Sequence, residues 1–118
     1  MSEILEKTEN FVVDLLSTKL DSSYLYHNLS HTQRVVKSTK ELLNFYNLGE
    51  NENEIALLAA WLHDTGYTEG SENHEEISCR ITRNFLGRQE YDEQKIERVC
   101  GLIMATKRFY EPQNLLEE

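Results

Sequence analysis

The chain has 118 residues, a length typical of one domain, and 39% of them are hydrophobic, enough for one modest core. It carries 12 basic and 21 acidic side chains, and this net charge of -9 disfavours binding to a nucleic-acid polymer or an anionic membrane. One proline and five glycines leave long uninterrupted segments, which favours helices over a sheet-rich fold.

Further features narrow the class of protein. Residues 1–7 contain no basic leader, and no stretch approaches the roughly 20 apolar residues needed to cross a bilayer, so we expect a cytoplasmic protein. Cys79 and Cys100 lie in apolar helical patterns without metal-binding spacing, which predicts buried free thiols. No linker or internal repeat divides the chain, so residues 1–118 are expected to form a single domain.

The first half of the chain predicts three helices. Apolar residues at three- and four-residue steps give an amphipathic helix over residues 4–20, with a break at Asp21. Ser30 begins a capping-box pattern that predicts the start of a second helix, which Gly49 closes. Asn51 begins a similar pattern before a third helix, whose apolar positions are typical of a buried face.

The second half predicts two more helices. Asn73 begins a further capping pattern, and the helix after it is expected to end near Gly87. Asp92 is positioned to cap a fifth helix that contains Met104, and Pro112 is expected to prevent its simple continuation. The sequence therefore predicts an all-α bundle of about five helices.

His63 and Asp64 are the most informative pair in the chain. They stand where the third apolar segment runs into a glycine-containing turn, and neighbours at a helix end can converge on a third object. An imidazole with a carboxylate suits a divalent ion such as Mn, Fe, Co, Ni, Zn or Mg. His31 supplies a second imidazole upstream, although a helix starting at Ser30 would need a crossed bundle to bring His31 to His63.

Four strings occur in an ordered series: YHNLSHTQRVV (26–36), WLHDTGY (61–67), ENHEEIS (72–78) and GLIMATK (101–107). Together they resemble the HD-domain superfamily of metal-dependent phosphohydrolases, most closely its small bacterial branch. The resemblance covers about residues 24–112. It implies an HD-type helical bundle in which His31, His63 and Asp64 are metal ligands.

The resemblance also exposes a departure from the family pattern. HD proteins carry a final aspartate ligand after the helix with the GLIMATK-like string, whereas the last aspartate here is Asp92, which precedes it. We therefore expect a domain that is incomplete at its C-terminus, with weak metal binding and little or no activity. One metal ion is expected, because Thr106 stands where binuclear relatives would carry another histidine.

Three further residues are candidates for substrate binding. Arg34 lies one helical turn from His31 and could clamp a phosphate, although exposed arginines on helices are common. His27 could orient a ligand or anchor a turn, and His74 could bind the substrate phosphate or face solvent. Asp64 could also act in catalysis by orienting the attacking water.

The functional expectation is hydrolysis of a phosphomonoester or phosphodiester of a small, nucleotide-like molecule by one divalent ion. The alternative is a non-enzymatic HD-like module, or an inactive fragment, that binds a ligand, a metal ion or another chain. A homo-oligomer is a further expectation, because a fourth ligand could come from a second chain. No nucleic-acid polymer or membrane is expected as a partner, given the acidic surface.

Overall fold

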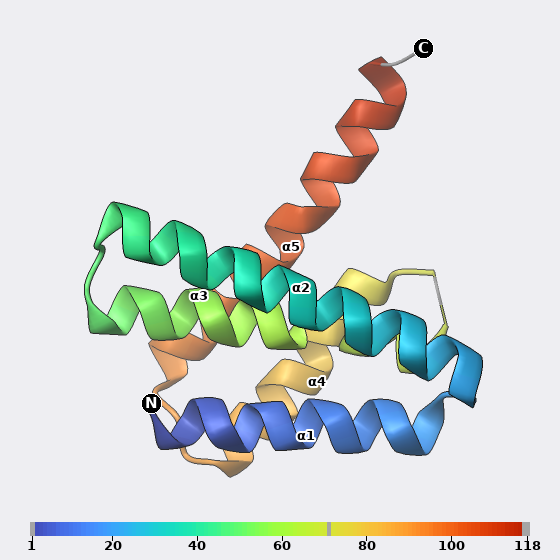
Figure 1. Ribbon diagram of the computed structural model, residues 1–118, viewed down its shortest axis with the longest axis horizontal. Helices are drawn as coiled ribbons and strands as arrows, with labels where there is room; N and C mark the ends of the chain where they lie inside the picture. Colours follow the sequence, from blue (N-terminus) through green and yellow to red (C-terminus); the bar gives the residue numbers. More distant parts are fainter. Residues whose placement is uncertain (1, 71, 117–118) are drawn as a thin grey trace.

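The structure is a computed structural model that describes residues 2–70 and 72–116, with side chains described as far as residue 106. Its helices, in chain order, are α1 (Glu3–Lys19), α2 (Ser22–Tyr46), α3 (Glu50–Leu62), the 3₁₀ helix η1 (Thr65–Glu69), α4 (His74–Arg88) and α5 (Glu93–Leu116) (Figure 1). The described residues contain no strand, so the predicted all-α bundle is confirmed. Among these residues, no helix combines the length and apolar character that crossing a membrane would require.

The second helix begins earlier than the capping box at Ser30 predicts. Asp21 is its N-cap, and the Asp21 carboxylate accepts hydrogen bonds from the backbone N–H groups of Ser23 and Tyr24, both at 3.1 Å. The polar residues that look like a break in the sequence are therefore a cap followed by the first helical turn. As a result, His31 lies within the helix and not in its first turn.

The other predicted boundaries have mixed outcomes. Asp92 does cap α5, accepting a hydrogen bond from the Lys95 N–H at 3.0 Å, as predicted. Asn47, in the left-handed conformation at φ 55°, ends α2 in place of Gly49. The prediction that Pro112 stops the fifth helix is wrong, since α5 continues to Leu116. A proline removes one backbone N–H but can be accommodated within a helical path.

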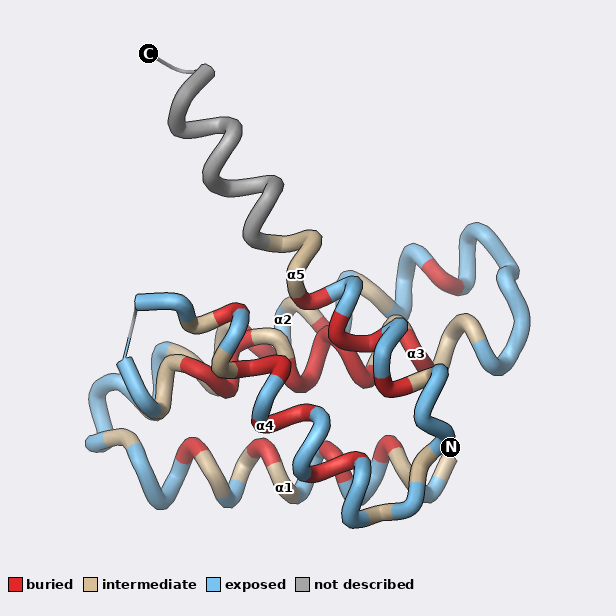
Figure 2. The backbone as a smooth tube through the Cα atoms, turned by 180° about the vertical axis from the view of Figure 1, so that it is seen from behind, coloured by how far each residue is buried: buried red, intermediate tan, exposed pale blue. Residues whose placement is uncertain are grey.

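Helix α3 is the centre of the bundle and packs against α1, α2 and α5, while α4 packs against α5 and η1. Buried residues run along α3 and along the faces of α1 and α4 that turn toward it (Figure 2). The rings of Phe11 and Phe85 stack with centroids 4.1 Å apart, which ties α1 to α4. The apolar positions predicted for the first, third and fourth helices thus contribute most of the core, whereas Leu42 and Tyr46 of α2, expected on an apolar face, are exposed.

The α2–α3 hairpin places the candidate ligands. Only residues 47–49 join the two helices, so they run antiparallel, side by side (Figure 1). In such a hairpin, residues at similar distances from the turn lie near each other, and His31 lies 15 residues before the end of α2 while His63 lies 13 residues after the start of α3. Because α2 is much longer than α3, the end of α3 reaches only the middle of α2, where His31 lies.

Candidate metal centre

His63 is held by the end of its own helix. It is the C-cap residue of α3, and its Nδ1 lies 2.7 Å from the Ala60 carbonyl oxygen. A carbonyl oxygen can only accept, so Nδ1 carries the proton and donates it. In the neutral ring the other nitrogen, Nε2, then bears a free lone pair. Metal-binding histidines commonly use one ring nitrogen in this way and ligate with the other.

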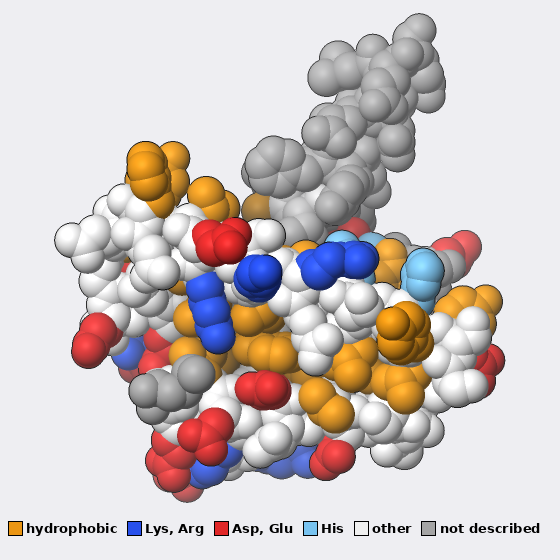
Figure 3. Space-filling view, viewed as in Figure 1, with side chains coloured by type: hydrophobic (Ala, Val, Ile, Leu, Met, Phe, Trp, Pro, Cys, Tyr) orange, Lys and Arg blue, Asp and Glu red, His pale blue; other side chains and the backbone are white. Residues whose placement is uncertain are grey.

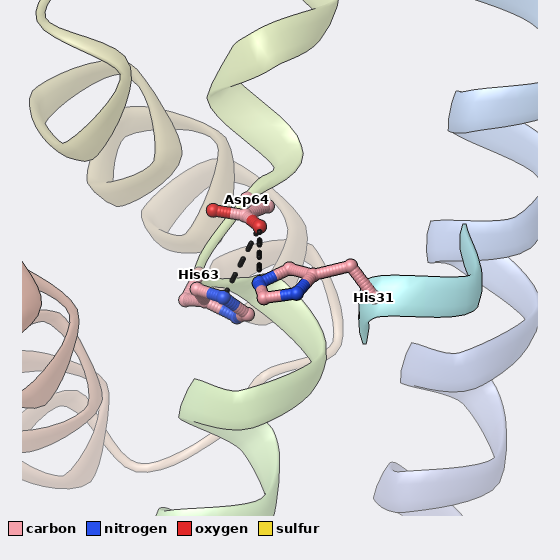
Figure 4. A group of neighbouring side chains, drawn as sticks. All are labelled: His31, His63 and Asp64. Atoms are coloured by element: carbon pink, nitrogen blue, oxygen red, sulfur yellow. Dashed lines mark ion pairs between the residues drawn. The ribbon is translucent and has the colours of Figure 1, made fainter. Parts of the chain in front are cut away.

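The Asp64 carboxylate lies close to both imidazole rings. Its Oδ2 lies 3.2 Å from His63 Nε2 and 3.3 Å from His31 Nε2, and Figure 4 shows both rings directed at this carboxylate. Asp64 occupies the N-cap position of η1, yet its side chain makes no capping hydrogen bond. Capping therefore does not explain the carboxylate at this position.

The charges of the cluster stabilise one another. Burial favours the neutral form of His63, but the hydrogen bond and charge of Asp64, with the hydrogen bond to the Ala60 carbonyl, outweigh it and raise the pKa of His63. Burial likewise favours a neutral Asp64, whereas His63, His31 and His74 hold its pKa below the ordinary value. The carboxylate is therefore ionised at neutral pH, and a proton and a metal ion compete for the same nitrogen.

This geometry fits a divalent ion. One ligand atom from each of His31, His63 and Asp64 lies within 4.8 Å of the other two. Ligand atoms bound to one ion at about 2.1 Å, with angles of about 90–110° between them, lie about 3.0–3.4 Å apart. The distances from Asp64 Oδ2 to His63 Nε2 and to His31 Nε2 fall within this range. Because the lone pair of neutral His63 faces a negative oxygen, a cation is needed between them, either a proton or a metal ion.

The cluster opens into a cavity of about 300 Å³, which is also lined by Tyr67, His74, Glu75 and Thr106. His74 Nε2 lies 3.2 Å from Glu75 Oε2 and 3.7 Å from Asp64 Oδ1, and its ring stacks on Tyr67 at 4.0 Å. The structure therefore brings His74 to the same cavity as the expected ligands. Its role in binding substrate stays a prediction.

Tyr67 and Glu75 also line the cavity, although the sequence predicted no role for either. Glu75 is a buried carboxylate at the cavity wall. A signal for it exists in the sequence, because Glu75 shares the helical stripe of Ser78, Cys79, Thr82 and Leu86, all of which are buried. A carboxylate on an otherwise apolar or small stripe indicates a buried ionisable group.

Ser78 and Gly66 form hydrogen bonds that hold the backbone next to the cluster in place. The Ser78 hydroxyl accepts a hydrogen bond from the Gly66 N–H at 2.7 Å and donates one to the His63 carbonyl at 2.9 Å. An added Cβ on Gly66 would lie far inside van der Waals contact with the His74 carbonyl oxygen and 2.9 Å from the Ser78 nitrogen. The Gly66 turn and α4 are thus in direct backbone contact, which fixes His63 and Asp64 relative to His74.

Arg34 and His27 are exposed on α2, one turn on either side of His31, and neither is among the described residues that line the cavity. Basic side chains gather on the face of the molecule over α2 (Figure 3), where Arg34, Lys37 and Lys40 are exposed. This basic surface is local, since the whole chain is acidic. Substrate binding by Arg34 and His27 stays a prediction.

The family comparison identifies the class of domain. A model of the HD domain matches residues 28–118, which is more than half of the chain. The chain belongs to the HD-domain family. The match begins three residues before His31 and also spans His63 and Asp64. No curated protein and no solved structure matches the chain in the corresponding searches.

Proposed function

We propose that this HD-domain protein is a metal-dependent phosphohydrolase that hydrolyses the phosphate ester of a small molecule, with His31, His63 and Asp64 holding one divalent ion. The observation that carries the proposal is the orientation of His63: Nδ1 is occupied by the Ala60 carbonyl, and Nε2 faces Asp64 beside His31. Membership of the HD-domain family supports this reaction class.

Each part of the proposed site has a distinct task. A divalent ion bound there would lower the pKa of a bound water and polarise a phosphoryl oxygen. Asp64, ionised at neutral pH, would hold the ion and accept a hydrogen bond from the attacking water. His74, wedged between Asp64 and Glu75, would contact the substrate phosphate. Arg34 and His27, on the exposed face of α2, would meet the anionic substrate as it approaches.

The test is a screen of phosphomonoesters and phosphodiesters, nucleotides among them, with each candidate metal and with a chelator. We expect weak hydrolysis that requires metal and that falls at least about 10²-fold in Asp64→Asn, which keeps the side-chain shape but removes the charge. Asp14→Asn is the matched control, because Asp14 is an exposed aspartate on α1. Metal-independent turnover, or equal turnover in both variants, would refute the proposal.

One observation favours a second function, a non-enzymatic HD module. A proton on His63 would also satisfy the contact with Asp64, and the raised pKa of His63 makes this protonated state more accessible. In that case the cluster would be a structural ion pair. Absence of both metal binding and turnover, with intact folding, would favour this second function.

A further inference from the structure

A second cavity adjoins the proposed metal centre. It is a groove of about 470 Å³ between α2, α3 and α5, with walls that include Val35 and Leu42, Ala56 and Ala60, and Leu102 and Ile103. Three residues, His31, His63 and Thr106, line both this groove and the cavity that contains Asp64. The groove therefore begins at the imidazole edge of the metal centre and leads away from it along α2.

The groove offers its occupant apolar surface and few hydrogen-bonding groups. Its two threonine hydroxyls have already donated their hydrogens within their own helices, so they can accept but not donate a hydrogen bond: Thr39 donates to the Val35 carbonyl at 2.8 Å, and Thr106 donates to the Ile103 carbonyl at 2.6 Å. The remaining wall away from the histidines is aliphatic. A polar group deep in this groove would lose its bonds to water without replacing them, which is costly.

The shape of the groove follows from small residues on α3. The wall on that side is formed by alanines, Ala56, Ala59 and Ala60, whereas the neighbouring Leu58 and Leu62 fill the core. At the rim, Leu42 is 58% exposed and Leu102 is 45% exposed, so both would lose contact with water when an apolar group binds. Ligand pockets of soluble proteins are mostly apolar with a few polar groups at one end, as here.

We propose that the groove binds the organic part of the substrate and that this part is apolar, an aryl or alkyl group, with the phosphate at His31, His63 and Asp64. The proposal rests on the proposed function and names its substrate class. The volume is sufficient, because an apolar cavity of about 150 Å³ already holds benzene. A nucleoside fits poorly, since most polar groups of its ribose and base would meet aliphatic walls.

Binding of non-hydrolysable phosphonates tests this proposal without any need for turnover. Benzylphosphonate, methylphosphonate and a nucleoside 5′-phosphonate are titrated calorimetrically into the full chain with saturating Mn²⁺. We expect benzylphosphonate to bind tighter than either of the others, on the order of tenfold or more. In Ala56→Leu, which fills the groove, the preference over methylphosphonate should disappear. Ala105→Leu, outside the groove lining, is the matched control and should keep it.

A rim variant protects the test against misfolding of Ala56→Leu. Leu42 is exposed, so the Leu42→Ser variant should fold normally. Its affinity for benzylphosphonate should fall several-fold, while its affinity for methylphosphonate should stay unchanged. Equal affinity for the three phosphonates, tightest binding of the nucleoside compound, a preference that survives these groove variants, or no phosphonate binding would overturn the proposal. Metal-dependent hydrolysis without the benzyl preference refutes the groove assignment alone, whereas the preference without any hydrolysis refutes the proposed function alone.

Discussion

Replacement of Gly66 by alanine should disrupt both the fold and the metal centre. The new methyl group would overlap the His74 carbonyl oxygen and lie 2.9 Å from the Ser78 nitrogen, and backbone atoms cannot rotate away as a side chain can. Overpacking of this kind costs about 1–3 kcal/mol. Separation of η1 from α4 would also break the Gly66–Ser78 hydrogen bond, which adds about 1 kcal/mol. We expect a loss of about 2–4 kcal/mol in the free energy of unfolding.

Urea denaturation followed by circular dichroism measures this loss. Gly101→Ala is the matched control, because a Cβ on Gly101 meets nothing within 4 Å. Gly101 lies inside α5, where alanine should stabilise the helix by about 0.5–1 kcal/mol. The two variants should therefore shift the midpoint in opposite directions. If Gly66→Ala is as stable as the original chain, the close approach of η1 to α4 is wrong, and so is the support it gives to His63.

Three further predictions concern the supports and charges of the site. Ser78→Ala should cost about 1–3 kcal/mol in thermal unfolding, because it leaves the Gly66 N–H and the His63 carbonyl without their partner; an unchanged melting temperature would contradict this. Asp92→Ala should cost about 0.5–2 kcal/mol by removing the cap of α5, and Asp92→Asn should restore most of it. The metal-free protein should lose stability as pH rises through the raised pKa of His63, because the stabilisation from this proton is complete only below the ordinary histidine pKa of about 6.5. It should also lose stability as pH falls through the lowered pKa of Asp64. Titration of unfolding against pH should lose the first slope in His63→Gln, and a slope that remains would show that another group is responsible.

Local patterns in the sequence predicted most of the fold. The apolar periodicity of α1, α3 and α4 matches their buried faces, and Asp92 caps α5 as its spacing predicts. The error at Ser30 arose because two capping patterns, at Asp21 and at Ser30, lie close together, and only one can start a continuous helix. Tertiary packing, which the local pattern does not contain, favours the longer helix.

The candidate site was predictable in its residue types but not in its geometry. The order of histidines and aspartate in the sequence pointed to His31, His63 and Asp64, and the structure places their ligand atoms together. The similar distances of the two histidines from the α2–α3 turn become meaningful only once the hairpin is known. The backbone contact between Gly66 and His74, and the burial of Glu75, depend on how η1 meets α4, so no local pattern could give them.

Metal binding by the full chain tests the central claim most directly. The protein, stripped of metal with a chelator, is dialysed to equilibrium against an excess of Mn²⁺ or of Zn²⁺, and the metal bound per chain is then measured by elemental analysis. The account predicts one ion per chain in the original sequence and in Asp14→Asn. It predicts loss of that ion in Asp64→Ala, with helicity by circular dichroism unchanged. Retention of one ion per chain by Asp64→Ala would contradict the assignment of the metal centre to His31, His63 and Asp64.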